Sequence, residues 1–284
     1  MNRDVVVVIG VGGMGQAIAR RQGAGRALLL ADFDKATLDS TAEALRGDGY
    51  DVATHHVDVS SPESVAGLAE AAAERGNITQ VAHTAGLSPA QAPAPVVLRV
   101  DLVGVALVLE EFGRVIAPGG AGIFIASMAG HMAAPLAPEQ EHALAHAPAE
   151  ELLHLPCTGT DTATDPGRAY TLAKRANLLR VRAAAGPWGK RGARVNSISP
   201  GVISTPMGRQ ELAGEAGQQM RAMVGASATG RLGTPNDIAD AAAFLLGPNA
   251  TFITGTDLLV DGGTVAAVHS GALKTPTRPE GLPA

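Results

Sequence analysis

Tyr170 and Lys174 form the pair in this sequence that is best suited to acid–base chemistry. They are four positions apart, so their side chains share one face if the segment is helical. A phenol has an ordinary pKa of about 10, and a cation held beside it favours the phenolate and lowers that pKa. Tyr170 is therefore a candidate general acid or base for a hydroxyl or carbonyl group. A tyrosine and a lysine at this spacing can also be an ordinary surface pair, so the rest of the chain has to decide between the two interpretations.

A glycine-rich turn near the N-terminus indicates dinucleotide binding. The apolar run Val5–Ile9 leads into glycines at residues 10–15, a helical pattern follows, and a second apolar run ends at Asp32. Glycines allow a tight turn and let backbone N–H groups approach a pyrophosphate at a helix N-terminus. The Asp32 carboxylate suits a hydrogen bond to the adenosine ribose and disfavours the 2′-phosphate of NADP, while Phe33 adds no cation. The sequence predicts NAD as the cofactor, against the alternative of a plain glycine turn in an α/β protein.

Apolar strand patterns alternate with helical patterns along the chain. This alternation predicts an α/β fold of the Rossmann type, with a doubly wound parallel sheet flanked by helices. Right-handed crossovers then place the loops that follow the strands along one edge, where ligands bind. We expect strands at residues 5–9, 27–31, 52–57, 78–82, 122–126, 194–199 and 257–260. We expect helices after the glycine turn and at 35–45, 62–75, 96–116, 168–185 and 236–246, with Gly186-Pro187 ending the fifth of these helices.

Residues 1–284 are expected to form a single domain with three less regular segments. The segment 131–165, rich in Ala, Pro, Glu and His, is an insertion between the fifth strand and the Tyr-bearing helix. We expect it to lie over the active-site edge of the sheet. The segment 200–233 suits a substrate lid, and 264–284 suits an irregular tail.

Composition excludes several classes of function. The net charge is −5, and no cluster of Lys and Arg suggests nucleic acid or an anionic membrane as a partner. No apolar run approaches the length that spans a membrane. The single cysteine, Cys157, excludes an internal disulfide and fits a reducing cytoplasm. His142 and His146 are spaced as a metal-binding pair could be, but a solvated helix face is the simpler interpretation and no metal is expected.

Five motifs together resemble the short-chain dehydrogenase/reductase family over roughly residues 4–264. They are the glycine turn with Asp32, Asp58-Val59, Ala85-Gly86, Ser127 followed by Tyr170 and Lys174, and the run Ser199–Thr205. The resemblance implies an oxidoreductase that interconverts an alcohol and a ketone, assembled as a homodimer or homotetramer. It also implies that Tyr170 carries the proton, that Ser127 hydrogen-bonds the substrate oxygen, and that Lys174 holds the nicotinamide ribose. The cofactor-binding residues implied are Gly10, Gly12, Gly13, Met14, Gly15, Asp32, Phe33, Asp58, Val59, Ala85, Gly86, Tyr170, Lys174, Pro200, Gly201, Ile203 and Thr205.

The chain departs from the pattern of that family at several positions. Its glycine turn is one residue shorter, and His83-Thr84 replaces the two asparagines usual before Ala85-Gly86. Asp101 occupies the position of an active-site asparagine whose backbone carbonyl helps to organise a water chain behind the lysine. We include Asp101 among the catalytic candidates, since an extra carboxylate near Lys174 would alter the proton relay.

The insertion itself suggests a branch of the family and a class of substrate. Ser127 and Tyr170 are separated by 42 residues, far more than is usual. A similar insertion occurs in the bacterial 3α-hydroxysteroid dehydrogenase/carbonyl reductase branch, which the runs Ala85–Pro89 and Trp188-Gly189 also resemble. This favours a bulky alicyclic or steroid-like substrate. Two other functions stay open: a catalytically inactive NAD-binding protein with a regulatory or structural role, and a sugar-nucleotide epimerase or dehydratase, for which the chain after Thr205 looks short.

Overall fold

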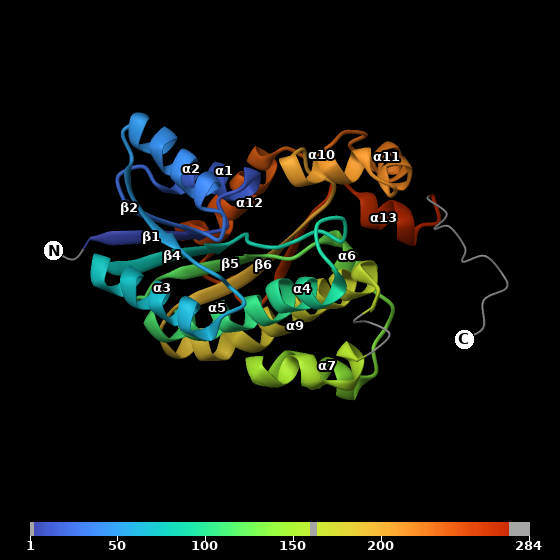
Figure 1. Ribbon diagram of the computed structural model, residues 1–284, viewed down its shortest axis with the longest axis horizontal. Coiled ribbons are helices and arrows are strands. Elements are labelled where there is room, and N and C mark those ends of the chain that lie inside the picture. Colours follow the sequence, from blue (N-terminus) through green and yellow to red (C-terminus); the bar gives the residue numbers. More distant parts are fainter. Residues whose placement is uncertain (1–2, 160–163, 273–284) are drawn as a thin grey trace.

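Seven strands form one parallel sheet, as the sequence predicts (Figure 1). In this computed structural model, residues 3–159 and 164–272 are described. The strands are β1 (Asp4–Ile9), β2 (Ala27–Asp32), β3 (Asp51–His56), β4 (Asn77–His83), β5 (Ala121–Ile125), β6 (Arg194–Pro200) and β7 (Asp257–Val260). Their order in the sheet is β3-β2-β1-β4-β5-β6-β7, and each neighbouring pair is parallel.

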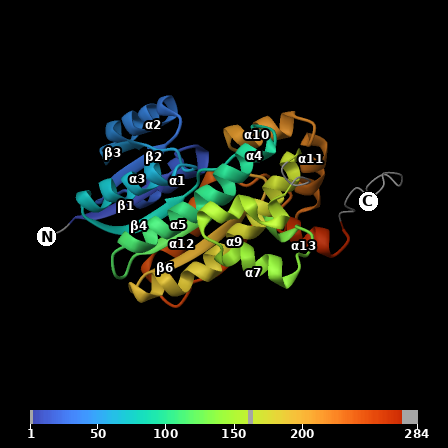
Figure 2. The ribbon, with the colours of Figure 1, turned by 60° about the horizontal axis from the view of Figure 1, so that its bottom comes forward.

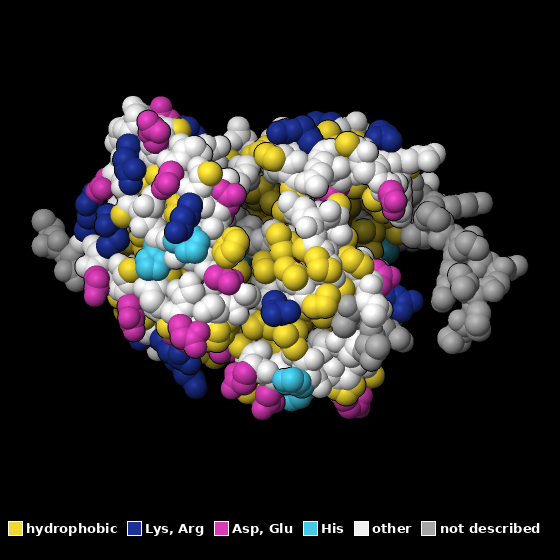
Figure 3. All heavy atoms as spheres, viewed as in Figure 1, with side chains coloured by type: hydrophobic (Ala, Val, Ile, Leu, Met, Phe, Trp, Pro, Cys, Tyr) yellow, Lys and Arg dark blue, Asp and Glu magenta, His cyan; other side chains and the backbone are white. Residues whose placement is uncertain are grey.

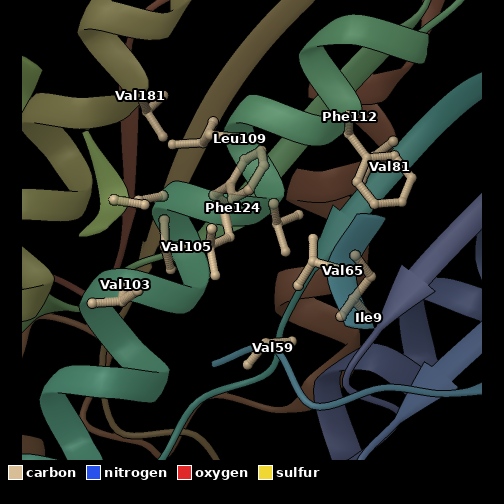
Figure 4. Packing of buried hydrophobic residues seen from close by; sticks show 14 of the residues in the cluster. Ile9, Val59, Val65, Val81, Val103, Val105, Leu109, Phe112, Phe124 and Val181 are labelled. Carbon is tan, nitrogen blue, oxygen red and sulfur yellow. The ribbon is translucent and has the colours of Figure 1, made fainter. Parts of the chain in front are cut away.

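Helices cover both faces of the sheet (Figures 1 and 2). One face carries α1 (Gly13–Gln22), α2 (Lys35–Gly47) and α12 (Pro235–Leu246). The other face carries α3 (Pro62–Arg75), α4 (Ala94–Leu98), η1 (Arg99–Val103), α5 (Gly104–Val115) and α9 (Pro166–Lys190). Burial on both faces explains why β1, β2 and β5 are apolar without alternation. Figure 4 shows side chains of this second layer, such as Phe112 and Val105, packed with Val81 and Phe124 of the sheet.

The chain reverses its direction of travel through the sheet between β1 and β4. β1 pairs with β2 on one side and with β4 on the other, so the loops that follow β1 and β4 leave in opposite directions. The carbonyl of Ile9 accepts hydrogen bonds from the backbone N–H groups of Thr84 and Ala85, at 2.7 Å and 2.9 Å. A crevice at the carboxyl end of such a pair of strands is the usual ligand site of an open α/β sheet.

The helix that carries Tyr170 is longer than the sequence predicts. We expected Gly186-Pro187 to end it, but α9 continues to Lys190. The fully buried Trp188 holds the last turn in place, because its indole N–H donates to the carbonyl of Leu109 at 3.1 Å. Its ring also meets that of Phe124 edge-on, with the centroids 6.3 Å apart. Packing from distant residues thus overrides the local helix-stop signal.

The described part of the insertion packs against the helical layer instead of the open edge that we expected. It begins at the end of α6 (Met128–His131) and contains α7 (Pro138–His146), η2 (Ala149–His154) and η3 (Pro156–Thr158), while residues 160–163 lie outside the described residues. α7 lies along α9, and η2 contacts η1 (Figure 2). Arg180 of α9 ties the segment down by donating to the carbonyls of Leu144 and Ala147, at 3.1 Å and 2.9 Å.

Four further short helices complete the described ranges, one of them η4 (Pro248–Ala250), a 3₁₀ turn after α12. α10 (Pro206–Ala213) and α11 (Gly217–Ala226) follow β6, and α13 (Thr264–His269) follows β7. We expected an irregular tail from residue 264, but Asp261 begins a helix by accepting hydrogen bonds from the N–H groups of Gly263 and Val265. The remainder of that tail, 273–284, lies outside the described residues. Within the described ranges, no helix has the length and apolar character needed to cross a membrane.

Candidate active site

α9 brings Tyr170 and Lys174 together on one face. The Lys174 ammonium lies 5.3 Å from the centroid of the Tyr170 ring. Lys174 is buried and Tyr170 half-buried. The Lys174 ammonium also donates to the carbonyl of Ile125 at the end of β5, at 3.5 Å. The helix is thereby joined to the carboxyl edge of the sheet, where parallel α/β folds bind ligands.

Ser127 reaches the same place from β5. It is the N-cap of α6, and its hydroxyl accepts a hydrogen bond from the N–H of Ala129 at 3.1 Å. The Ser127 hydroxyl acts to lower the pKa of Tyr170, so it lies close to the phenol. The hydroxyls of these two residues therefore converge, although 42 residues of chain separate them.

The pKa of Tyr170 is raised, which the sequence argument did not predict. Burial raises the pKa most, and the Lys174 charge and the nearby Ser127 hydroxyl only partly lower it again. The negative charges of Asp101 and Glu211 add to the rise. The Lys174 charge lowers the pKa of Tyr170, as expected, but the desolvation of the phenolate raises that pKa by more.

Asp101 lies directly beside Lys174 and forms a buried ion pair with it. The two charged groups are 3.5 Å apart, and the Asp101 side chain is fully buried in η1, a π-helical turn within the long helix. The N–H of Leu87 donates to the second Asp101 oxygen at 2.8 Å. Burial raises the pKa of Asp101, and the Lys174 charge and these hydrogen bonds oppose the rise. The pKa of Lys174 is raised as well: burial is the largest single influence and acts to lower it, but Asp101, by its charge and its hydrogen bond, and the charge of Tyr170 together outweigh burial.

Gly86 connects this pair to the crevice between β1 and β4. A Cβ atom added at Gly86 would lie 3.2 Å from the Asp101 carboxylate and 3.3 Å from the Lys174 ammonium. A side chain at this position would therefore press on the pair, which would have to give way by a few tenths of an ångström. The neighbouring Ala85 contacts the glycine turn, where a Cβ at Gly10 would overlap its backbone.

The glycine turn after β1 has the geometry of an anion-binding site. Gly10 has a φ of +85°, in the left-handed region that glycine favours. Gly12 precedes α1 without any side-chain cap, and the first turn of α1 contains no acidic residue. A Cβ at Gly12 would meet nothing within 4 Å, whereas one at Gly15 would overlap the carbonyl of Gly10. The backbone beside Gly12 therefore leaves space at the start of the helix, whereas Gly13 is covered by Thr205 and Pro206. Met14 packs into the core on the side of α1.

Asp32 faces the glycine turn from the end of β2. Its carboxylate accepts hydrogen bonds from the N–H groups of Val11, at 2.7 Å, and Asp34, at 2.9 Å. Phe33 is 67% exposed, and its ring lies 5.7 Å from that of His56. Asp32 is therefore fixed in orientation, while Phe33 presents an aromatic face at the surface beside it.

The remaining candidates surround the same edge of the sheet. Val59 packs against Gly104, and the Asp58 carboxylate is occupied by the N–H and hydroxyl of Ser60. Thr205 caps α10 and lies against Gly13 of the glycine turn. Pro200 is the last residue of β6. Gly201 and Ile203 line a cavity of about 190 Å³ whose lining does not include Ser127, Tyr170 or Lys174.

Several groups of this region carry no signal in the sequence pattern. Glu211 of α10 is half-buried, and its charge acts on Tyr170. His131, four residues after Ser127, pairs with Asp257 of β7 at 2.7 Å. These contacts join residues far apart in the chain, so spacing could not reveal them. In the described ranges there is no cluster of three or more His, Cys, Asp or Glu that could hold a metal ion. The His142 and His146 rings stack on each other, with centroids 4.4 Å apart.

Comparisons with known proteins agree with this architecture. The family model described as Enoyl-(Acyl carrier protein) reductase matches residues 10–150 and 141–265. The short-chain dehydrogenase/reductase bsc3 of Alternaria brassicicola is 39% identical, over 94% of this chain and 97% of that protein. The cis-4-hydroxycyclohexanecarboxylate dehydrogenase of Sinomonas cyclohexanicum is 29% identical, over 93% of this chain and 97% of that protein. Among solved structures, levodione reductase has a TM-score of 0.74 at 25% identity, covering 93% of this chain and 98% of that chain.

The matches extend over nearly the whole chain, and the relatives are named as dehydrogenases and reductases. The seven-stranded parallel sheet and its helices agree with the solved relatives. The chain is therefore an oxidoreductase that belongs to the short-chain dehydrogenase/reductase family.

Proposed function

We propose that this chain is an NAD-dependent oxidoreductase that interconverts a secondary alcohol and a ketone. The observation that carries the proposal is the convergence of Tyr170, Ser127 and Lys174 at the carboxyl edge of the sheet. A proton carrier, a second hydroxyl and a cation in one crevice suit a reaction in which a substrate oxygen gains or loses a proton.

The residues after β1 and β2 fit a dinucleotide. The uncapped start of α1 can bind a pyrophosphate through backbone N–H groups, and Gly12 leaves the space for it. The Asp32 carboxylate, fixed by its two hydrogen bonds, suits a ribose diol and repels a 2′-phosphate, which favours NAD over NADP. When bound, the nicotinamide supplies or accepts the hydride.

The side chains of the site divide the remaining work. In alcohol oxidation, the Tyr170 phenolate accepts the hydroxyl proton, and in ketone reduction the phenol returns it. The Ser127 hydroxyl hydrogen-bonds the same substrate oxygen and orients it. The Lys174 charge favours the phenolate, and Asp101 keeps Lys174 protonated. In this scheme Asp101 is a positioning residue for Lys174.

The chain between β6 and α12 suits a lid over the substrate. Hydrogen bonds between Ser204 and Gly233 and between Gly233 and Val202 close its base. α10 and α11 lie beyond that base, above a hollow around which hydrophobic side chains gather (Figure 3). An apolar hollow supports an alicyclic or steroid-like substrate. We further propose that the chain forms a homodimer or homotetramer and that it is cytoplasmic. Light scattering, which gives the mass of the assembly, would test the number of subunits.

The proposal is tested with the Tyr170→Phe variant and with Tyr50→Phe as the matched control. Tyr50 lies near the surface and donates to the carbonyl of Arg20, so its variant should keep wild-type turnover. Loss of the Tyr170 hydroxyl should lower turnover of a cyclic alcohol by about 10²–10⁴-fold. Fluorescence titration of both variants should still show NADH binding, with NADPH bound far more weakly.

Each other outcome has a distinct meaning. Retained turnover in Tyr170→Phe would exclude Tyr170 as the proton carrier, and equal binding of NADH and NADPH would contradict the role given to Asp32. Tight NADH binding by the wild type without turnover of any alcohol or ketone in a broad panel would favour the alternative function, an NAD-binding protein without catalysis.

A further inference from the structure

The short helix that begins at Ser127 is fastened at its other end. Ser127 is the N-cap of α6, and His131 is the last residue of that helix. The Nε2 atom of His131 lies 2.7 Å from a carboxylate oxygen of Asp257, the first residue of β7. A carboxylate only accepts hydrogen bonds, so His131 donates the proton of this bond whether its ring is neutral or charged. The bond therefore ties α6, which follows β5, to the edge strand of the sheet.

Asp257 is itself held in place by the neighbouring strand. Its other carboxylate oxygen accepts hydrogen bonds from the hydroxyls of Ser197, at 2.6 Å, and Ser199, at 3.0 Å, both in β6. Both serines are fully buried, and the Asp257 side chain is only 11% exposed. A buried polar network whose members are all paired is rigid. Asp257 is therefore a fixed point to which His131 binds.

The middle of α6 rests on the helix that carries the proposed proton carrier. A Cβ atom added at Gly130 would lie 2.8 Å from the backbone carbonyl oxygen of Lys174, which is closer than real Cβ atoms approach. α6 thus packs directly against the backbone of α9 at Lys174. The helix has only four residues, and the Gly130 N–H donates to the carbonyl of Ser127 at 3.0 Å. A movement at the His131 end is therefore transmitted to Ser127 within a single turn.

We propose that His131, through its hydrogen bond to Asp257, is a positioning residue for Ser127. It holds the Ser127 hydroxyl at a fixed place relative to Tyr170 and Lys174 of α9. Without this bond α6 keeps its contact with α9 but loses the tie at its C-terminal end. A displacement of about 1 Å in a group that orients the substrate costs up to about 10²-fold in rate. The inference rests on the proposed function, because it concerns the role that Ser127 has there.

The first test compares His131→Leu with His131→Gln. Leucine cannot donate a hydrogen bond, whereas the glutamine amide nitrogen lies as many bonds from Cβ as Nε2 does and can donate to Asp257. The His131 side chain is 28% exposed, so neither change leaves a large buried cavity. In His131→Leu, kcat for a cyclic alcohol should fall by about tenfold, with KM and the Kd of NADH unchanged, and His131→Gln should restore most of it.

Two further variants frame this comparison. His269→Leu is the matched control, because His269 is an exposed histidine that also ends a short helix, α13, and its variant should keep the wild-type kcat. Ser197→Ala removes one hydrogen-bond donor from Asp257 and hardly changes the volume of the side chain. It should lower kcat in the same direction as His131→Leu but by a smaller factor.

The second test is a double-mutant cycle with Ser127→Ala. If His131 acts through Ser127, His131→Leu should change kcat by no more than about twofold once the Ser127 hydroxyl is absent. A tie that serves stability alone would lower kcat by the same factor with and without that hydroxyl. Such an additive result would overturn the inference, as would an unchanged kcat in His131→Leu or equal losses in the leucine and glutamine variants. None of these outcomes contradicts the proposed oxidoreductase function.

Amide hydrogen exchange tests the inference without turnover. The N–H groups of Gly130 and Met132 donate to the carbonyls of Ser127 and Met128, at 3.0 Å and 3.2 Å. In His131→Leu both amides should exchange about fivefold faster, the factor that the loss of one hydrogen bond implies. Unchanged exchange would overturn the inference. A wild-type protein that converts no alcohol or ketone would instead contradict the proposed function, and the exchange rates would still decide whether His131 holds Ser127 in place.

Discussion

The buried pair of Lys174 and Asp101 sets the electrostatics of the proposed proton carrier. Lys174 stabilises the Tyr170 phenolate, but the Asp101 carboxylate destabilises it and also raises the pKa of Lys174. Both charges are buried, so both act on the phenol: Lys174 lowers the pKa of Tyr170 and Asp101 raises it. The net effect of the two charges is added to the rise that burial causes. An asparagine at residue 101 would remove one of the two charges.

We expect Asp101→Asn to move the pH dependence of alcohol oxidation to lower pH. Oxidation needs the phenolate, so its rate rises with pH up to the pKa of Tyr170. Asp101 raises that pKa, and its removal lowers it. The measurement is kcat/KM for oxidation across pH, with Asp240→Asn, an exposed carboxylate of α12, as the control. A shift to higher pH would mean instead that Asp101 acts mainly by keeping Lys174 charged.

At the scale of elements, strands could be predicted better than the ends and contacts of helices. Runs such as Val5–Ile9 are apolar because both faces are covered, and that property is visible in the sequence. The motif residues after each strand converge because parallel strands end at one edge, so the meeting of Ser127 with Tyr170 could be predicted. The extension of α9 past Pro187 could not, because it depends on the contact of Trp188 with Leu109. Glu211 likewise reaches the site only through the placement of α10.

The insertion illustrates the same limit. Its helical segments could be expected from the sequence, but their docking on α9 depends on single contacts. Arg180 is nearly buried and donates to two carbonyls at the end of α7, while its second terminal nitrogen contacts Glu110 at 3.1 Å. Glu141 of α7 forms a further ion pair with Arg175 of α9. An arginine within a helical pattern gives no indication that it anchors another element.

We expect Arg180→Met to destabilise the chain and to loosen the insertion. The change leaves the carbonyls of Leu144 and Ala147 and the Glu110 carboxylate without this donor, a loss of about 2–3 kcal/mol in the free energy of unfolding. Urea unfolding measures the change in the free energy of unfolding. A looser insertion should also be cut faster by a protease between residues 138 and 159. Arg182→Met, at an exposed position of the same helix, is the control. An unchanged unfolding midpoint would show that the insertion is held by its apolar contacts alone.

At the scale of the whole molecule, one buried histidine couples folding to pH. His83 ends β4 and is 1% exposed, and neither ring nitrogen has a hydrogen-bond partner of normal geometry among the described residues. Its ring lies 5.5 Å from that of Phe124 in the core. Burial, together with the charge of Lys174, lowers the pKa of His83 to about 3, from 6.5. The folded chain therefore holds this ring neutral at pH values where the unfolded chain protonates it.

The sign of the resulting effect on stability is fixed by these two pKa values. Because the folded pKa lies below the unfolded one, the unfolded chain binds the extra proton as the pH falls below 6.5. Stability is thereby lost progressively from about pH 6.5 down to about pH 3, and the contribution at pH 5 is about 2 kcal/mol.

We expect His83→Leu to reduce the loss of unfolding free energy between pH 7.5 and pH 5 by about this amount. Urea unfolding at the two pH values measures it, and the comparison within each variant cancels any change in packing. His154→Gln, at an exposed position, should show the wild-type loss. An equal loss in His83→Leu would mean that the ring takes up its proton inside the folded chain, beside Lys174.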